Sequence, residues 1–219
     1  MVKSVIGEKV VKIPVGKATI NGNLIIPPTA KGIVLFAHGS GSGRVSPRNI
    51  KVAREINAAG IATLLIDLLT EEEEAIDIYS GEFRFNIELL ADRLVFATEW
   101  LKKNPETKNL AVGYFGASTG AAAALIAAAK LPDWTKVVVS RGGRPDLAGE
   151  YLPKVKAPTL LIVGGNDFQV LELNKQAMAQ MSAEKKMAVV PGATHLFEEP
   201  GKLEKVAKLA ISWFSKFLA

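Results

Sequence analysis

The 219-residue sequence contains no cysteine. Disulfide bonds, thiolate metal sites and a cysteine nucleophile are therefore excluded. Histidine is scarce as well, because His38 and His195 are the only two, and this scarcity disfavours a metal centre built from several histidines. We expect a protein that works without a metal or another cofactor.

Long apolar runs and dense runs of one charge are also missing. The longest apolar stretch, residues 121–129, is far shorter than the roughly 20 residues of a membrane-spanning helix, and the first residues lack the apolar core of a secretory signal. The formal net charge is +5, but basic residues are scattered singly or in pairs, too sparsely to follow a phosphate backbone. We therefore expect a cytoplasmic protein that binds neither a membrane nor nucleic acid.

The remaining composition is that of a globular protein, with 48% hydrophobic and 22% charged residues. The length suits one large domain, and no linker or internal repeat divides it. We therefore expect residues 1–219 to form a single domain. The sequence leaves the oligomeric state open, and a homo-oligomer is compatible with it.

Short apolar runs alternate with longer helical patterns along the chain. Continuous apolar runs are typical of strands that are covered on both faces. Their alternation with helices predicts an α/β fold, with a doubly wound, mostly parallel sheet and helices on both faces. After a hairpin formed by residues 10–15 and 18–26, we expect strands at 32–36, 62–66, 110–115, 137–139, 159–163 and 187–190, and helices at 49–59, 87–103, 119–130, 171–181 and 203–217.

Residues 69–84 depart from this pattern and include the acidic run from Glu71 to Glu74. One interpretation is the start of a solvated helix, where acidic side chains are favoured by the helix dipole. The other is a small mobile flap over a site. The sequence does not decide between them.

The strongest functional pattern is Gly-x-Ser-x-Gly at residues 116–120, between an expected strand and an expected helix. In this context the pattern predicts a nucleophile turn, in which Ser118 projects from a strained connection at the carboxyl ends of the strands. The alternative is a glycine-rich helix cap without chemistry. A serine nucleophile needs a base, and His195 lies in a loop after the last expected strand. His38 directly follows another strand, and we expect it to anchor a loop.

A base of this kind is oriented by an acid. Asp167 follows the strand at 159–163, which gives the chain order serine, acid, histidine that is typical of such hydrolases. Asp146 is the second candidate, and Asp67 and Glu198 are weaker ones. For Asp167 the structural alternative is an Asx turn.

An oxyanion intermediate needs two donors, and we expect them to be the backbone N–H groups of Thr119 and Ser40. The loop at 38–43 matches neither phosphate-binding glycine motif. Arg141 and Arg144 end another strand at the same edge and either bind a carboxylate or phosphate of a substrate or pair with Asp146, Glu198 or Glu199. Three aromatic side chains are candidates to line a substrate pocket: Trp134, Phe168 and Phe197.

These segments resemble those of the α/β-hydrolases, and in particular the dienelactone-hydrolase-like branch, over nearly the whole chain from Lys31 to Phe217. The resemblance implies Ser118 as nucleophile, Asp167 as orienting acid and His195 as base, with no large lid inserted. The segments that carry it are 36–42, 113–120, 140–145 and 192–197.

One residue departs from the branch, because dienelactone hydrolases proper use a cysteine nucleophile and this chain has Ser118. We therefore expect a serine hydrolase that cleaves small-molecule carboxylic esters, or lactones, through an acyl-enzyme. An acyltransferase or perhydrolase working on the same triad remains an alternative. So does a binding module that has kept the fold without catalysis.

Overall fold

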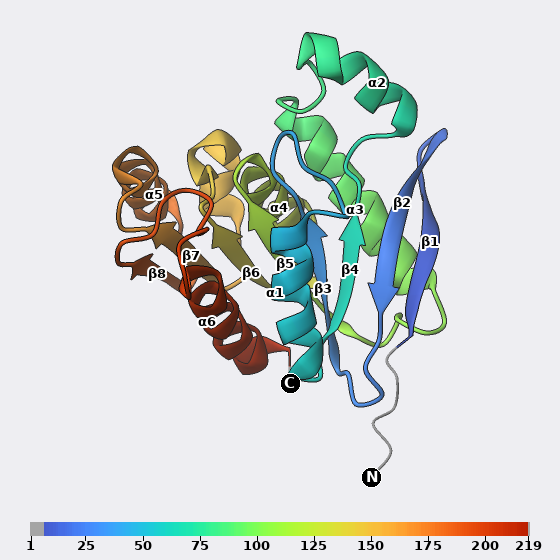
Figure 1. The fold of residues 1–219 in the computed structure, drawn as a ribbon. Coiled ribbons are helices and arrows are strands. Elements are labelled where there is room, and N and C mark those ends of the chain that lie inside the picture. The colour runs from blue at the N-terminus through green and yellow to red at the C-terminus, as the bar shows by residue number, and fades with distance from the viewer. Residues whose placement is uncertain (1–6, 219) are drawn as a thin grey trace.

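An eight-stranded sheet lies at the centre of the molecule in the computed structural model, which describes residues 7–218 (Figure 1). Its strand order is β1-β2-β4-β3-β5-β6-β7-β8. β2 pairs antiparallel with both β1 and β4, and every other neighbouring pair is parallel. The strands are β1 (Glu8–Val15), β2 (Ala18–Ile25), β3 (Gly32–Ala37), β4 (Ala62–Ile66), β5 (Ala111–Ala117), β6 (Thr135–Arg141), β7 (Thr159–Gly164) and β8 (Lys185–Val190).

Helices cover both faces of this sheet. α1 and α6 lie side by side on one face, and α3, α4 and α5 lie on the other (Figure 1). The expected doubly wound, mostly parallel sheet is therefore confirmed. The helices are α1 (Pro47–Ala58), α2 (Glu71–Ser80), α3 (Ile87–Lys103), α4 (Thr119–Lys130), the 3-10 helix η1 (Pro145–Lys154), α5 (Phe168–Gln180) and α6 (Lys202–Phe217).

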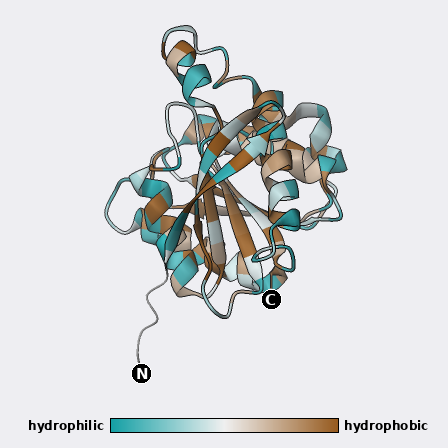
Figure 2. Cartoon of the chain, turned by 90° about the vertical axis from the view of Figure 1, so that its right-hand side faces the viewer, coloured by the Kyte–Doolittle hydropathy of each residue, from teal (hydrophilic) through white to brown (hydrophobic). Residues whose placement is uncertain are grey.

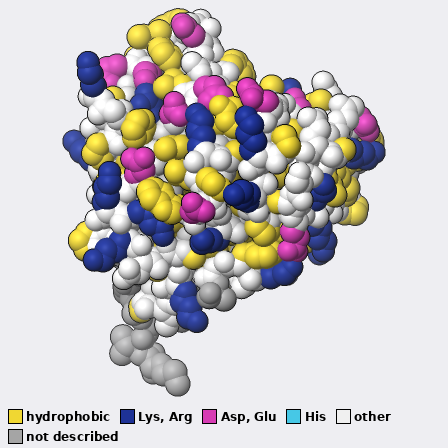
Figure 3. Space-filling model, turned by 180° about the vertical axis from the view of Figure 1, so that it is seen from behind, with side chains coloured by type: hydrophobic (Ala, Val, Ile, Leu, Met, Phe, Trp, Pro, Cys, Tyr) yellow, Lys and Arg dark blue, Asp and Glu magenta, His cyan; other side chains and the backbone are white. Residues whose placement is uncertain are grey.

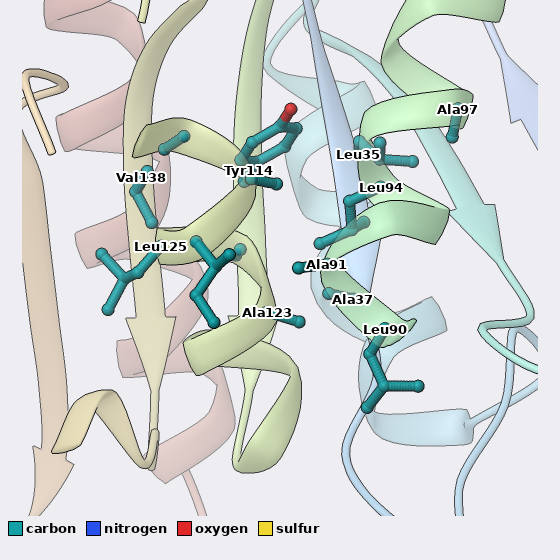
Figure 4. Close-up of a cluster of buried hydrophobic side chains, with 14 of the residues drawn as sticks. Leu35, Ala37, Leu90, Ala91, Leu94, Ala97, Tyr114, Ala123, Leu125 and Val138 are labelled. Atoms are coloured by element: carbon teal, nitrogen blue, oxygen red, sulfur yellow. The ribbon is translucent and has the colours of Figure 1, made fainter. Parts of the chain in front are cut away.

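The two faces of the sheet form two separate hydrophobic cores. Along β3, Ile33 and Leu35 belong to the core under α3 and α4, whereas Val34 and Phe36 belong to the core under α1 and α6. Successive side chains of a strand point to opposite faces, so a strand that is covered twice must be apolar at every position. Figure 4 shows part of the first core, and Figure 2 shows apolar colouring concentrated on the central strands.

Most of the expected strands and helices differ from the structure by one to three residues at one or both ends. α1 begins two residues early because Pro47 occupies its first turn, where a missing N–H has no cost. The segment η1 was not predicted. It holds Pro153 inside the helix and Gly149 at a non-helical φ of 48°, so its local pattern is not that of a regular helix.

The acidic segment forms α2, which stands beyond the upper ends of the strands in Figure 1. Thr70 and Glu73 form a reciprocal capping box at its start. Arg93 of α3 donates to Glu73, and Asp77 accepts hydrogen bonds from the backbone of residues 83 and 84. These contacts tie α2 to the body of the protein at both of its ends.

Charged side chains are spread over the surface. Figure 3 shows Lys and Arg interspersed with acidic and apolar side chains on the face seen from behind. No helix formed by residues 7–218 is both long enough and apolar enough to cross a membrane.

Candidate active site

Ser118 occupies a strained turn between β5 and α4. Its φ of 50° and ψ of −122° lie in a region that residues other than glycine rarely adopt. The surrounding backbone holds this conformation, because the Ser118 N–H donates to the Arg141 carbonyl and the Ser118 carbonyl accepts from the Arg144 N–H. The turn therefore has the geometry expected for Gly-x-Ser-x-Gly, at the carboxyl end of a central strand.

Close backbone packing explains the second glycine of the pattern. A Cβ on Gly120 would lie 2.4 Å from the carbonyl oxygens of Ala37 and His38, a distance that no side chain tolerates. The absence of a side chain brings α4 against the end of β3. The loop after β3 is thereby placed beside Ser118, and a Cβ on Gly39 would lie 3.0 Å from the Ser118 Cβ.

His195 and Asp167 meet at the same edge of the sheet. The Nδ1 atom of His195 lies 2.7 Å from Oδ2 of Asp167, whose side chain is 14% exposed against 38% for the histidine. A carboxylate only accepts hydrogen bonds, so this contact places the ring proton on Nδ1 and leaves Nε2 as an acceptor. Among residues 7–218 the ring makes no hydrogen bond to the Ser118 hydroxyl.

Each of the other candidate acids forms an ion pair with an arginine. Asp146, the second candidate, pairs with both Nε and Nη2 of Arg144, at 2.9 Å and 2.7 Å. The same contact answers the question left open for Arg144, since its guanidinium has an acidic partner. The remaining pairs are Asp67 with Arg44 and Glu198 with Arg48.

Ser40 and Thr119, the expected oxyanion donors, are in direct contact. The Ser40 N–H donates to the Thr119 hydroxyl over 3.1 Å. The loop is in the expected place, but one of its two predicted donors already has an acceptor. This contact has no signature in the sequence, because it depends on the threonine rotamer.

His38 fixes the loop that carries Ser40. Its Nε2 accepts from the Leu68 N–H at 3.0 Å and its Nδ1 lies 2.9 Å from the Gly39 carbonyl. The ring is therefore neutral, with its proton on Nδ1. Burial lowers the pKa of His38, although the Gly39 carbonyl and the charges of Asp67 and Glu74 act in the opposite direction. These contacts agree with the anchoring role expected for His38.

Arg141 and the aromatic candidates occupy different environments. Arg141 is buried, with its Nη2 donating to Asn49. Phe168 begins α5 beside Asp167 and is exposed, whereas Phe197 is buried in the core under α1 and α6. The prediction that Trp134 lines the pocket is wrong. It directly precedes β6, and the amino end of this strand lies at the opposite edge of the sheet from Ser118.

A cavity of about 900 Å³ adjoins the loop that follows Ser40. Ser118, Asp167 and His195 are not among its lining residues, which come from the hairpin, residues 41–48 and the start of α2. Within residues 7–218 no group of three or more His, Asp or Glu side chains is arranged to hold a metal ion.

Comparison with known proteins assigns this arrangement to a family. The model of the dienelactone hydrolase family matches residues 20–218. The chain belongs to the dienelactone hydrolase family. A crystal structure of a dienelactone hydrolase from Anabaena variabilis is 58% identical, with a TM-score of 0.97, and the match covers 98% of this chain and 99% of that one. The fold is accordingly the α/β-hydrolase fold.

More distant and longer relatives complete the comparison. Est1E from Butyrivibrio proteoclasticus shares the fold at 16% identity, with a TM-score of 0.78 over 94% of this chain and 98% of its own. Two curated proteins of Mycobacterium tuberculosis are 56% identical to this chain over 207 residues, which is 94% of its length. Both carry the name phosphoribosyl transferase. The match covers 46% of each relative, so the chain spans about half of their length.

Proposed function

We propose that the protein hydrolyses small-molecule carboxylic esters through an acyl-enzyme formed on Ser118. The observation that carries this proposal is the 2.7 Å contact between His195 and Asp167, at the same sheet edge as the strained Ser118 turn. A hydroxyl is a weak nucleophile until a base removes its proton. His195 can serve as this base because its contact with Asp167 leaves Nε2 without a proton.

In the proposed reaction, the Ser118 oxygen bonds to the carbonyl carbon of the ester while Nε2 of His195 takes the hydroxyl proton. Asp167 stabilises the resulting imidazolium. The tetrahedral intermediate then expels the alcohol, which receives this proton from His195. Water attacks the acyl-enzyme by the same route, giving up a proton to His195 and releasing the carboxylic acid and the free serine.

The developing oxyanion would be held by backbone N–H groups at the start of α4. The Thr119 N–H is one donor, aided by the positive end of the helix dipole. The Ser40 N–H is the other, and the oxyanion takes the place of the Thr119 hydroxyl as its acceptor. Rotation of the threonine side chain between staggered positions is enough for this exchange.

The comparisons support hydrolysis over transfer for this part of the relatives. The family and the 58% identical structure are named for hydrolysis. The name phosphoribosyl transferase belongs to proteins of which this chain matches 46%. We infer that the activity in that name resides in the portion of those proteins that lies outside the match.

Hydrolysis of p-nitrophenyl acetate and longer p-nitrophenyl esters, wild type beside Ser118→Ala, tests the proposal. Loss of the serine from a Ser-His-Asp triad costs about 10⁶-fold in kcat, so we expect a loss of this size in the variant. His195→Gln should fall similarly. Equal rates in wild type and Ser118→Ala would contradict the proposal.

A fluorophosphonate probe and product analysis separate the alternatives. Labelling of the wild type but not of Ser118→Ala is expected for an activated serine, whereas a binding module without catalysis would stay unlabelled. Reaction in the presence of a competing alcohol or hydrogen peroxide reports the acceptor. Hydrolysis predicts the free acid as the main product, and a transferred acyl group as the main product would favour acyl transfer.

A further inference from the structure

Arg141 is a buried cation without an acidic partner. Its side chain is enclosed, with the residue 5% exposed. Nη2 donates to Oδ1 of Asn49 over 3.1 Å, and Nε has no hydrogen-bond partner. The neighbouring Arg48 and Arg144 each pair with a carboxylate, but within residues 7–218 Arg141 has none. A buried charge of this kind is costly to keep, and its retention points to a partner that the chain does not itself supply.

The guanidinium remains charged at neutral pH despite its surroundings. Burial, and then the positive charge of Arg48, lower the pKa of Arg141 to about 10. Two positive groups therefore lie close together, and Glu198 neutralises only the outer one, Arg48. An uncompensated positive charge is left at Arg141.

The first turn of α1 adds donors beside this charge. Arg141 reaches this turn through its bond to Asn49. The turn has no acidic residue, and the Ser46 side chain makes no capping hydrogen bond. Pro47 has no N–H to offer, but the backbone N–H groups of Arg48 and Asn49 have no intrahelical partners. With the helix dipole they attract an anion.

We propose that Arg141 and the first turn of α1 bind a phosphate group carried by the ester substrate. This inference rests on the proposed ester hydrolysis and names a substrate class for it. A guanidinium and helix N–H groups together suit the several oxygens of a tetrahedral anion.

The site lies close to the proposed catalytic loops. The backbone carbonyl of Arg141 accepts from the Ser118 N–H. Arg48, in the same turn of α1, contacts Glu198 in the loop of His195 at 2.8 Å. A substrate phosphate held here would be close to the acyl group on the serine, so the subsite belongs to one substrate and not to a remote effector.

The cavity of about 900 Å³ offers room for the rest of such a substrate. Its lining includes Ser46, Pro47 and Arg48 at the start of α1, and the glutamates at the start of α2 line it as well. Carboxylates repel a phosphate and accept hydrogen bonds from hydroxyl groups. The cavity therefore favours a ligand with its phosphate toward α1 and hydroxyl groups toward α2.

Calorimetric binding of inorganic phosphate at constant ionic strength tests the proposal independently of turnover. We expect wild type and Ser118→Ala to bind phosphate alike, and Arg141→Met to bind it at least tenfold more weakly. Asn49→Asp gives Arg141 an internal carboxylate partner and should weaken binding to the same degree. The Asn49→Asp variant still tests the proposal if Arg141→Met does not fold. Glu198→Gln releases Arg48 and should tighten binding severalfold.

Arg54→Met is the matched control, because Arg54 lies on the exposed side of α1 and the change in net charge is the same. Phosphate binding that is equal in wild type, Arg141→Met and Asn49→Asp would overturn the proposal, as would no measurable binding to wild type. Acetate or succinate binding more tightly than phosphate would also overturn it, by assigning the site to a carboxylate. Failure of ester hydrolysis would instead appear as inactivity of wild type with phosphate binding intact.

Discussion

Replacing His38 with glutamine should remove a pH dependence from the stability of the fold. The His38 ring is 8% exposed and is held neutral by the Leu68 N–H and the Gly39 carbonyl. Burial lowers the pKa of the ring below its usual 6.5. The unfolded chain therefore binds a proton at a higher pH than the folded chain does. The stability contributed by His38 is complete above pH 6.5 and declines as the pH falls below it.

The size of this effect follows from the proton affinity of the unfolded histidine. Between about pH 7.5 and about pH 5.5, protonation stabilises an unfolded histidine by about 1.4 kcal/mol. The free energy of unfolding should therefore fall by at most about 1.4 kcal/mol on account of His38. In His38→Gln, the side-chain oxygen can still accept from Leu68 but does not titrate, so this part of the fall should be absent.

Urea unfolding of both proteins at the two pH values measures the difference. Every other side chain is the same in the two proteins, so its contribution cancels when the two falls are subtracted. We expect wild type to lose up to about 1.4 kcal/mol more than His38→Gln. Parallel losses in the two proteins would refute the inference that the fold keeps His38 neutral.

Four further substitutions test the site. Asp167→Asn should lower kcat by about 10³- to 10⁴-fold by disturbing the histidine tautomer. Asp146→Asn should leave kcat within about twofold of wild type, because the partner of Asp146 is Arg144. A large loss in Asp146→Asn and a small one in Asp167→Asn would instead make Asp146 the orienting acid. Thr119→Val removes the acceptor of the Ser40 N–H. It should raise kcat by at most about fivefold and lower the free energy of unfolding by about 1 kcal/mol. A lower kcat would instead indicate that the threonine hydroxyl itself donates to the oxyanion. Gly120→Ala places a Cβ 2.4 Å from two backbone oxygens, and urea unfolding should show a loss of at least about 1–3 kcal/mol; an unchanged midpoint would contradict the packing described.

The sequence predicted an element best where buried apolar side chains recur regularly along it. β3 is apolar at every position and β4 at every position except Thr63, because helices cover both faces of the sheet. This pattern is visible without coordinates. α3 and α4 matched the expected bounds because clear signals delimit them. The segment η1 was missed, since Pro153 and the positive φ of Gly149 interrupt any regular helical pattern.

The site was only partly accessible to the same reasoning. Chain order and strand ends were enough to propose Ser118, Asp167 and His195, because the carboxyl ends of parallel strands meet at one edge. The sequence does not reveal that Arg141 is buried without an acid or that the Thr119 side chain reaches Ser40. Both depend on rotamers and on which residues face one another across separate loops.

The order of strands has a consequence for how the protein is made. From β5 onward, each strand adds to the edge left by the one before it, in the order of synthesis. The turn with Ser118 can thus form once β6 and Arg144 are in place, while β7 and β8 are still within the ribosome. His195 arrives only after β8 completes the edge. We expect ester hydrolysis during refolding to appear later than backbone circular dichroism. Ester hydrolysis would then be detected only after β8 and the His195 loop have folded. Before that point, Ser118 would lack its base and would be inactive.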